Sequence, residues 1–350
     1  MCSVAVEDKS NVIVPLSDAT RTEFANLVTN CGSFEEKGDC RLSITGGDRV
    51  RWLNGMITNN VRDLPQNQGI YAFLLNPQGH ILGDLYAYNR GDSLLVETDP
   101  DQKEKIFSTF DRYIIMDDVE LTDITEQSAS IQVAGPKALE ALWAIGIEVP
   151  ELRNLQFADL AWRGQPVTVV RHDNPAVDSY QLWIPPGART EIQPALANAA
   201  AKPVGPDAIE LLRIGSGVPR YGQDIRERDL PQETEQTRAL HFSKGCYIGQ
   251  EIVERIRSRG AVHRTFTGFE VHATLPQPGA KIQSGGKDVG EITSAATLPL
   301  DGGELRVALG YLRREFAVPG KELQADGAQL SVATLPFKKI FPAKDPTNHA

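Results

Sequence analysis

Residues Gly69–Tyr88 read GIYAFLLNPQGHILGDLYAY, and this stretch indicates how the fold is built. Two apolar runs, Gly69–Leu75 and Ile81–Tyr88, flank the turn-forming residues Asn76-Pro77-Gln78-Gly79. Apolar runs separated by turns of this kind are typical of antiparallel strands. A third run at Ser93–Glu97 follows a second turn, so we expect an antiparallel meander.

One helix is expected before this meander in the sequence and another after it. Asp48 has the position of an N-cap for a helix that runs to Met56. Pro100–Tyr113 has helical spacing, with Ile106 and Phe110 on the face that points inward.

The rest of the chain changes character twice. Between residues 128 and 201, short strands alternate with helices, which predicts a small α+β unit. From Arg264 onward, short strands are divided by Gly and Pro, which favours an all-β barrel or sandwich. The first twenty residues are mixed and are expected to be partly extended. The predicted fold class is α+β.

Composition and charge exclude several classes of protein. The chain has 350 residues and a net charge of −10, which argues against a dominant nucleic-acid or anionic-membrane surface. Its first ten residues include Glu7 and Asp8 and lack the apolar core of a signal peptide. No run of eighteen apolar residues occurs, so no membrane span is predicted.

Four cysteines, Cys2, Cys31, Cys40 and Cys246, lie far apart in the sequence. No C-x-x-C pair is present, which does not support a zinc ribbon or a dithiol redox motif. A chain of this size without a secretory leader needs no disulfide framework, so a reducing cytosol is the expected location.

The octet Lys244–Glu251, KGCYIGQE, is the segment most suggestive of chemistry. A nearby cation such as Lys244 favours the thiolate, which is the form that attacks electrophiles and binds soft metals. Gly245 removes side-chain bulk beside the sulfur, so another molecule can approach. The alternative is that Cys246 is a small apolar residue packed in a loop. We interpret Cys246 as a functional thiol.

Five segments resemble the YgfZ/GcvT folate-binding family, the relatives of the aminomethyltransferase T-protein of the glycine cleavage system. They are Asn54–Val61 (NGMITNNV), Leu75–Leu85 (LNPQGHILGDL), Val133–Pro136 (VAGP), Arg213–Asp224 (RIGSGVPRYGQD) and the octet. The octet is typical of the YgfZ branch rather than of T-proteins.

The resemblance implies a GcvT-like architecture of three parts around a central cavity. Residues 20–120 and 205–258 would form a discontinuous folate-binding domain, residues 121–204 a smaller α+β domain, and residues 262–342 a β-barrel. By this resemblance the protein would bind tetrahydrofolate and act in iron–sulfur cluster assembly or repair. Its partners would be cluster carriers and client proteins, such as the iron–sulfur enzymes that modify tRNA, with no direct binding of nucleic acid or membrane.

Asp84 is the clearest polar candidate outside the octet, because a carboxylate in an apolar strand needs a partner. In T-proteins an aspartate at this motif contacts the folate. The alternative is that Asp84 lies on the solvent face of an edge strand. The chain departs from the T-protein pattern at Gly83, Gln181 and Ser216, where acids are expected. Gln181 can still hydrogen-bond a pterin, but it lacks the charge of a carboxylate.

Further ligand-binding candidates are Arg213, Tyr221 and Arg257. Arg213 either contacts the ligand or forms a structural salt bridge. Arg257 belongs to a run of basic residues that suits a polyglutamyl tail, although a solvated basic face is the ordinary alternative. We expect Asp84, Gln181 and Arg213 to converge on the cavity.

Two functions of different classes remain open. The first is a folate-binding accessory factor without turnover, in which Cys246, Lys244 and Asp84 carry the chemistry. A lone thiolate does not build a cluster site, which usually takes four ligands, so Cys246 would bind metal only in a cluster shared with a partner. Its other open roles are to accept a one-carbon or sulfur adduct and to support the fold of the folate pocket. The second is an aminomethyltransferase or folate-dependent demethylase of the T-protein type. A scaffold that has lost folate binding is a third reading.

Overall fold

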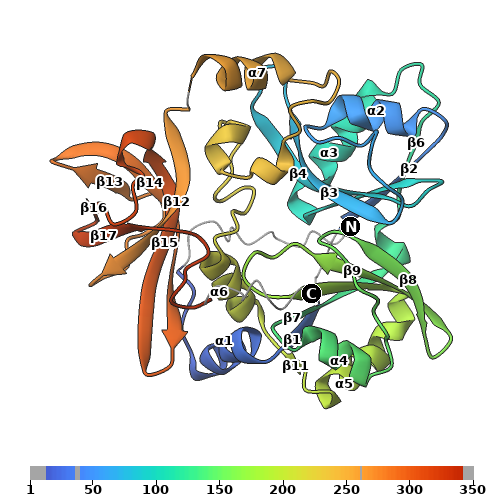
Figure 1. Ribbon diagram of the computed structural model, residues 1–350, viewed down its shortest axis with the longest axis horizontal. Coiled ribbons are helices and arrows are strands. Elements are labelled where there is room, and N and C mark those ends of the chain that lie inside the picture. The colour runs from blue at the N-terminus through green and yellow to red at the C-terminus, as the bar shows by residue number, and fades with distance from the viewer. Residues whose placement is uncertain (1–12, 36–39, 261, 342–350) are drawn as a thin grey trace, which may run out of the picture. The chain divides into compact units, whose positions relative to one another are not determined.

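The structure is a computed structural model that describes residues 13–35, 40–260 and 262–341 (Figure 1). Contacts divide these residues into two compact units. The first unit contains residues 22–205 and 227–260. The second contains residues 13–21, 206–226 and 262–341, so residues 206–226 group with the C-terminal strands. The division into three domains stays a prediction.

The first unit contains a five-stranded sheet with the strand order β3-β4-β5-β2-β6. Its strands are β2 (Cys40–Thr45), β3 (Gln68–Leu75), β4 (Ile81–Asn89), β5 (Leu94–Thr98) and β6 (Glu120–Asp123). Antiparallel pairing of β3 with β4 and of β4 with β5 confirms the predicted meander.

Two helices cover this sheet and have the bounds that the sequence indicated to within a residue or two. They are α2 (Arg49–Met56) and α3 (Pro100–Tyr113). Ile106 and Phe110 of α3 are fully buried and pack in one core with Leu53 of α2. Burying a side chain of this size contributes about 1.5–3 kcal/mol, so this apolar stripe fixes the position of α3 beside β4.

The first unit also contains a six-stranded sheet with the order β11-β1-β7-β10-β9-β8. Its strands are β1 (Gly32–Glu35), β7 (Ala129–Ala134), β8 (Phe157–Trp162), β9 (Gln165–His172), β10 (Ser179–Ile184) and β11 (Lys202–Pro203). The helices α4 (Ala138–Ala144) and α5 (Arg189–Asn198) accompany it. These alternating elements confirm the expected α+β character. The sequence did not predict β1, which joins this sheet by pairing with β7.

The two sheets of the first unit meet at an aromatic cluster. The Tyr88 ring of β4 lies edge-on to the Trp183 ring of β10, with centroids 5.0 Å apart. Arg41 of β2 stacks over Trp183 at 4.8 Å and pairs with Glu97 at 2.8 Å. Arg41 is only 1% exposed and also donates to Ser130 of β7, so this buried side chain has partners on both sheets.

The second unit is built around a closed barrel of six strands in the order β12-β15-β14-β13-β16-β17. The strands are β12 (Arg264–His272), β13 (Lys281–Ser284), β14 (Lys287–Leu300), β15 (Gly303–Arg313), β16 (Glu322–Ala325) and β17 (Ala328–Ala333). This confirms the prediction of a C-terminal β-barrel. Helix α6 (Pro206–Ser216) belongs to the same unit, and Gly215 O accepts a hydrogen bond from Phe337 N.

Two further α-helices, α1 and α7, lie in the described chain. Helix α1 (Asp18–Thr29) begins after Ser17, whose Oγ accepts a hydrogen bond from Thr20 N at 3.1 Å. The expectation that the first twenty residues are partly extended falls largely on residues outside the described ranges, and residues 18–20 begin this helix, which the sequence did not predict. Helix α7 (Gln250–Arg259) begins within the octet, whose last two residues form its start. No helix in the described ranges has both the length and the apolar content that a membrane crossing requires.

Candidate functional site

Asp84 lies on β4, at the centre of a polar cluster in the first unit. Its Oδ2 accepts a hydrogen bond from the Tyr71 hydroxyl at 2.5 Å, and its Oδ1 accepts one from Gln102 Nε2 at 2.7 Å. Gln102 Oε1 in turn accepts from Asp84 N at 2.8 Å. Strand β4 is flanked by β3 and β5, which excludes the alternative of an exposed edge strand.

Burial raises the pKa of Asp84, while hydrogen bonds from Tyr71 and Gln102 and the charge of Arg238 act in the opposite direction. Desolvation penalises the ionised form, and donors or nearby cations favour it. The side-chain donors of Tyr71 and Gln102 use two of the roughly four acceptor positions of a carboxylate. The group thus has the chemistry to accept a hydrogen bond from a ligand N–H.

Gly83 stands where the T-protein pattern has an acid, and the structure gives a packing reason for its small size. A Cβ atom at this position would lie 2.9 Å from Gln102 Oε1 and 3.2 Å from Ile106 Cδ1. A larger side chain would push α3 away from β4 and move Gln102 off Asp84.

Arg238 and Asp173 also belong to the cluster, and the sequence did not single them out. The Arg238 guanidinium lies over the Tyr71 ring, 4.2 Å from its centroid, and pairs with the Asp173 carboxylate. Asp173 also accepts a hydrogen bond from the Tyr86 hydroxyl at 3.2 Å. No local pattern marks either residue, because pairing of distant segments brings them together. We call Tyr71, Asp84, Tyr86, Gln102, Asp173 and Arg238 the Asp84 cluster.

Lys244 of the octet is held by backbone oxygens. Its Nζ donates hydrogen bonds to the carbonyls of Asn54, Ile57 and Asn59 at 2.6–2.7 Å. Burial, followed by the charge of Arg62, lowers the pKa of Lys244 to about 7. The carbonyls work against proton loss, because only the ammonium has three N–H donors. Lys244 therefore binds the carbonyl groups at the C-terminal end of α2. Its proposed effect on the pKa of the Cys246 thiol stays a prediction.

Cys246 is exposed, whereas Cys31 and Cys40 are buried, and Cys2 lies outside the described residues. Exposure gives Cys246 the access that a reactive thiol requires. No group of three or more His, Cys, Asp or Glu side chains in the described chain is placed to hold a metal ion. A cluster shared with a partner remains the form in which Cys246 is predicted to bind metal.

The octet rests on two other segments that the sequence marked. Ile248 N donates to Gly55 O at 3.2 Å, which joins the octet to the segment Asn54–Val61. Gly249 has a φ of +80°, and a Cβ atom there would lie 2.6 Å from Asn76 O. The octet is therefore pressed against the turn between β3 and β4, and these motif residues position the loop of Cys246.

Gln181 lies on β10 and is only 1% exposed. Its Oε1 accepts a hydrogen bond from Trp183 Nε1 at 2.9 Å. It lies opposite Gln132 of β7 in the sheet register. Contact of Gln181 with a pterin stays a prediction.

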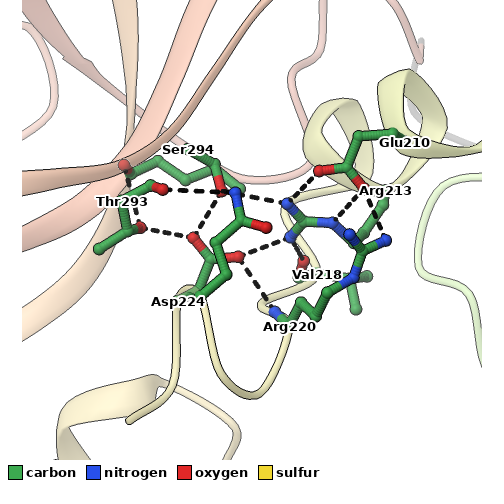
Figure 2. Close-up of polar contacts among 9 residues, drawn as sticks. Glu210, Arg213, Val218, Arg220, Asp224, Thr293 and Ser294 are labelled. Carbon is green, nitrogen blue, oxygen red and sulfur yellow. Dashed lines mark hydrogen bonds and ion pairs between the residues drawn. The ribbon is translucent and has the colours of Figure 1, made fainter. Parts of the chain in front are cut away.

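Arg213 belongs to the second unit, where it is the hub of a charged cluster (Figure 2). It donates five hydrogen bonds: two to Glu210, one each to Val218 O and Asp224, and one to Ser294. A guanidinium has five N–H donors, so all of them are used within the protein. This arrangement favours the structural salt bridge over ligand contact.

Asp224 is the acceptor side of the same cluster and is fully buried. It accepts from Arg213 Nη1 at 2.7 Å, from Thr293 Oγ1 at 2.5 Å and from Ser294 Oγ at 2.7 Å. The cluster thereby fastens the chain after α6 to strand β14 (Figure 2).

The remaining predicted ligand-binding residues are Tyr221 and Arg257. Tyr221 is partly buried and forms an isolated bridge with Ile225 in the second unit. Arg257 of α7 is exposed and lies over the Phe242 ring at 4.6 Å, beside the start of the octet. Convergence of Asp84, Gln181 and Arg213 stays a prediction, as do the ligand contacts of Tyr221 and Arg257.

Comparison with known proteins assigns this chain to the family that carries the GCVT N-terminal domain. Residues 11–244 match the GCVT N-terminal domain, and residues 263–337 match the CAF17 C-terminal β-barrel domain. The chain is 27% identical to the aminomethyltransferase of Rubrobacter xylanophilus over 82% of its own length and 78% of the relative. It is 26% identical to the aminomethyltransferase of a Nostoc species, over 89% of this chain and 85% of that one.

A solved structure shows the same fold. The glycine cleavage system aminomethyltransferase T from Bartonella henselae matches with a TM-score of 0.83 at 21% identity. The match covers 93% of this chain and 91% of that one. The GcvT-like fold is therefore confirmed.

Proposed function

Because the chain belongs to the GCVT family and carries the CAF17-type barrel, we propose that it binds tetrahydrofolate and assists iron–sulfur cluster assembly or repair. It would work in the cytosol, with cluster carriers and iron–sulfur enzymes, including those that modify tRNA, as its partners. Cys246 would be the thiol that engages the partner.

The Asp84 cluster supports the folate part of this proposal. Asp84 is held in place by Tyr71 and Gln102 and retains acceptor capacity for a pterin N–H. Aromatic rings of Tyr71 and Tyr86, 5.1 Å apart, provide apolar surface beside the carboxylate. A fixed polar group within aromatic surroundings is typical of small-molecule sites.

The observation that carries the iron–sulfur part is the exposed thiol of Cys246 on a loop that the protein fixes. Three carbonyl contacts hold Lys244, and the close approach at Gly249 holds the other end of the loop. A structural cysteine would be buried, as Cys31 and Cys40 are. A fixed, exposed thiol suits one ligand of a cluster shared with a carrier.

Folate binding is tested with a matched pair of carboxylate variants. Tetrahydrofolate should raise the melting temperature of the wild-type protein and of Asp92→Asn, whose carboxylate lies in an exposed turn. It should raise that of Asp84→Asn far less, because the amide loses the ionic acceptor. Equal shifts in all three proteins would remove Asp84 from the folate site.

The role of Cys246 is tested in cells that lack this protein. We expect Cys246→Ser to fold normally and to fail to restore aconitase-type iron–sulfur enzymes. Ser243→Ala, an exposed change in the same loop, is the matched control and should restore them. Full rescue by Cys246→Ser would contradict the proposed role of the thiol.

Aminomethyl transfer is the second candidate, because the similar curated proteins are named aminomethyltransferases. Gly83, Gln181 and Ser216 stand where that chemistry is expected to use acids. Incubation with an aminomethyl-lipoyl carrier and tetrahydrofolate separates the two functions. Formation of methylene-tetrahydrofolate at a catalytic rate would favour the transferase, whereas its absence together with folate binding would favour the accessory factor.

A further inference from the structure

Arg238 lies in the short helical turn η4 (Thr237–Ala239), six residues before Lys244. The backbone of this turn is attached to the segment that follows α2. Asn59 Nδ2 donates to Arg238 O at 2.8 Å, and Thr58 Oγ1 donates to Ala239 O at 2.6 Å. The stretch from Arg238 to Lys244 is thus held at both ends, and it leads directly to Cys246.

The side chain of Arg238 reaches in the other direction, into the Asp84 cluster. Its guanidinium covers the ring of Tyr71, whose hydroxyl donates to Asp84. It also pairs with Asp173, whose side chain is only 8% exposed. Removing the guanidinium would leave this nearly buried carboxylate with the Tyr86 hydroxyl at 3.2 Å and His172 Nδ1 at 3.7 Å as polar neighbours, which is costly.

We propose that Arg238 is a positioning residue that ties the Asp84 cluster to the loop of Cys246. Its planar guanidinium can stack on Tyr71 and pair with Asp173 at the same time, which a flexible ammonium does less well. The ligand part of this inference rests on the proposed folate site. The connection to the loop does not depend on folate binding, because it rests on the backbone contacts of η4 and on the contacts of the Arg238 side chain.

Arg238 also affects the charge of Asp84. The titratable groups around Asp84 are Tyr71 from β3, Tyr86 from β4 and Arg238 from η4. Asp173 pairs with Arg238, and His172 lies beside Tyr86 and Asp173. Gln102 faces Asp84 from α3 without a charge. Arg238 is the cation among them, so its loss should keep Asp84 protonated to a higher pH.

The test uses Arg238→Gln, Arg238→Lys and a control, Arg153→Gln, which removes an exposed arginine elsewhere in the same unit. Each is made in a Cys2→Ser background. Two quantities are measured: the dissociation constant for tetrahydrofolate as a function of pH, and the rate at which iodoacetamide alkylates Cys246 in the ligand-free protein.

Arg238→Gln should weaken folate binding at least tenfold, shift the pH midpoint of binding upward and speed alkylation at least threefold. Arg238→Lys should keep binding within threefold of wild type, because the charge remains, and should still speed alkylation, because the stacking is lost. A residue that only stabilises the fold would not separate the two quantities in this way. If Arg238→Gln does not fold, Arg238→Lys alone decides the question.

Wild-type values in both measurements for Arg238→Gln or Arg238→Lys would overturn the inference. Absence of folate binding by the wild-type protein would instead overturn the folate part of the proposed function. In that case the alkylation rates alone decide whether Arg238 holds the loop.

Discussion

At the scale of single residues, the two glycines of the octet have different requirements. Gly249 adopts a φ of +80°, which L side chains rarely adopt, and a Cβ atom would lie 2.6 Å from a backbone oxygen. At Gly245 the nearest atom to an added Cβ is Arg62 Nη2, at 3.8 Å, which is an ordinary contact. The fold therefore requires glycine at position 249. At position 245 the fold would accept a side chain, so the absence of one there can instead keep the thiol of Cys246 accessible.

This difference predicts opposite outcomes for two alanine variants. Gly249→Ala should lower the free energy of unfolding by about 2–4 kcal/mol, because strain and a steric clash add. Gly245→Ala should change it by less than about 1 kcal/mol. Urea unfolding measures both. A stable Gly249→Ala protein would show that the turn at Asn76 can move away from the octet.

Lys244 is a second residue whose role becomes clear from its contacts. Lys244→Met keeps much of the side-chain length but loses three hydrogen bonds to carbonyls, so we expect destabilisation by about 2–4 kcal/mol. Lys202→Met is the control, because Lys202 donates to one carbonyl, Ala197 O, at the surface. It should cost less than about 0.5 kcal/mol. Thermal unfolding measures both variants. Equal falls in melting temperature would contradict a stabilising role for the three hydrogen bonds of Lys244.

At the scale of elements, the hairpin of β13 and β14 carries a charged pair with a consequence for acid stability. Glu291 lies opposite Lys281 and also pairs with Arg226 at 2.6 Å. Partial burial raises the pKa of Glu291, but the hydrogen bonds of Arg226 and Lys281 outweigh it and lower the pKa to about 2. The folded state therefore holds this carboxylate ionised more strongly than the unfolded state does.

The sign of the pH effect follows from that shift. The contribution of Glu291 is present above the unfolded pKa of about 4.5 and is lost as the pH falls toward about 2. Glu291→Gln should lower stability by about 1 kcal/mol at pH 7 and flatten the loss of stability between these pH values. Glu322→Gln, an exposed change in β16, should leave the curve unchanged. Denaturant titrations at several pH values measure both curves.

The elements also show which parts of the structure the sequence could predict. Helix α3 has the predicted bounds, because its apolar spacing and its N-terminal proline are local signals. Strand β1 has only four residues, and its partner β7 lies about a hundred residues further along the chain. Helix α1 was missed although Ser17 supplies a capping signal, because the pattern that follows is weakly amphipathic.

In the Asp84 cluster and the octet, too, the sequence could not predict contacts between residues that lie far apart along the chain. Asp84 and Cys246 could be selected from sequence, since each stands out from its neighbours by chemical type. Arg238 and Asp173 could not, because their meeting depends on how η4 packs beside the residue that follows β9, far earlier in the chain. The use of every Arg213 donor within the protein is likewise visible only in three dimensions.

At the scale of the whole molecule, the distribution of thiols between surface and core predicts a simple labelling pattern. In a Cys2→Ser background, one thiol, Cys246, should react rapidly with a thiol reagent in the native protein. Cys31 and Cys40, at 1% and 4% exposure, should react only after unfolding. Counting labels by mass spectrometry with and without denaturant checks this, and Cys246→Ser should show no rapid reaction. A second rapid site would mean that a core opens readily.

The order of segments in the second unit affects how the protein emerges during synthesis. Arg213 and its partner Ser294 are 81 positions apart in the sequence. A ribosome that adds about 5–20 residues each second therefore synthesises Ser294 roughly 4–16 s after Arg213. Until then Asp224 lacks the hydroxyl groups of Thr293 and Ser294. A nascent chain interrupted by a premature stop codon near residue 261 would keep that deficit permanently, and cellular quality control would be expected to degrade it.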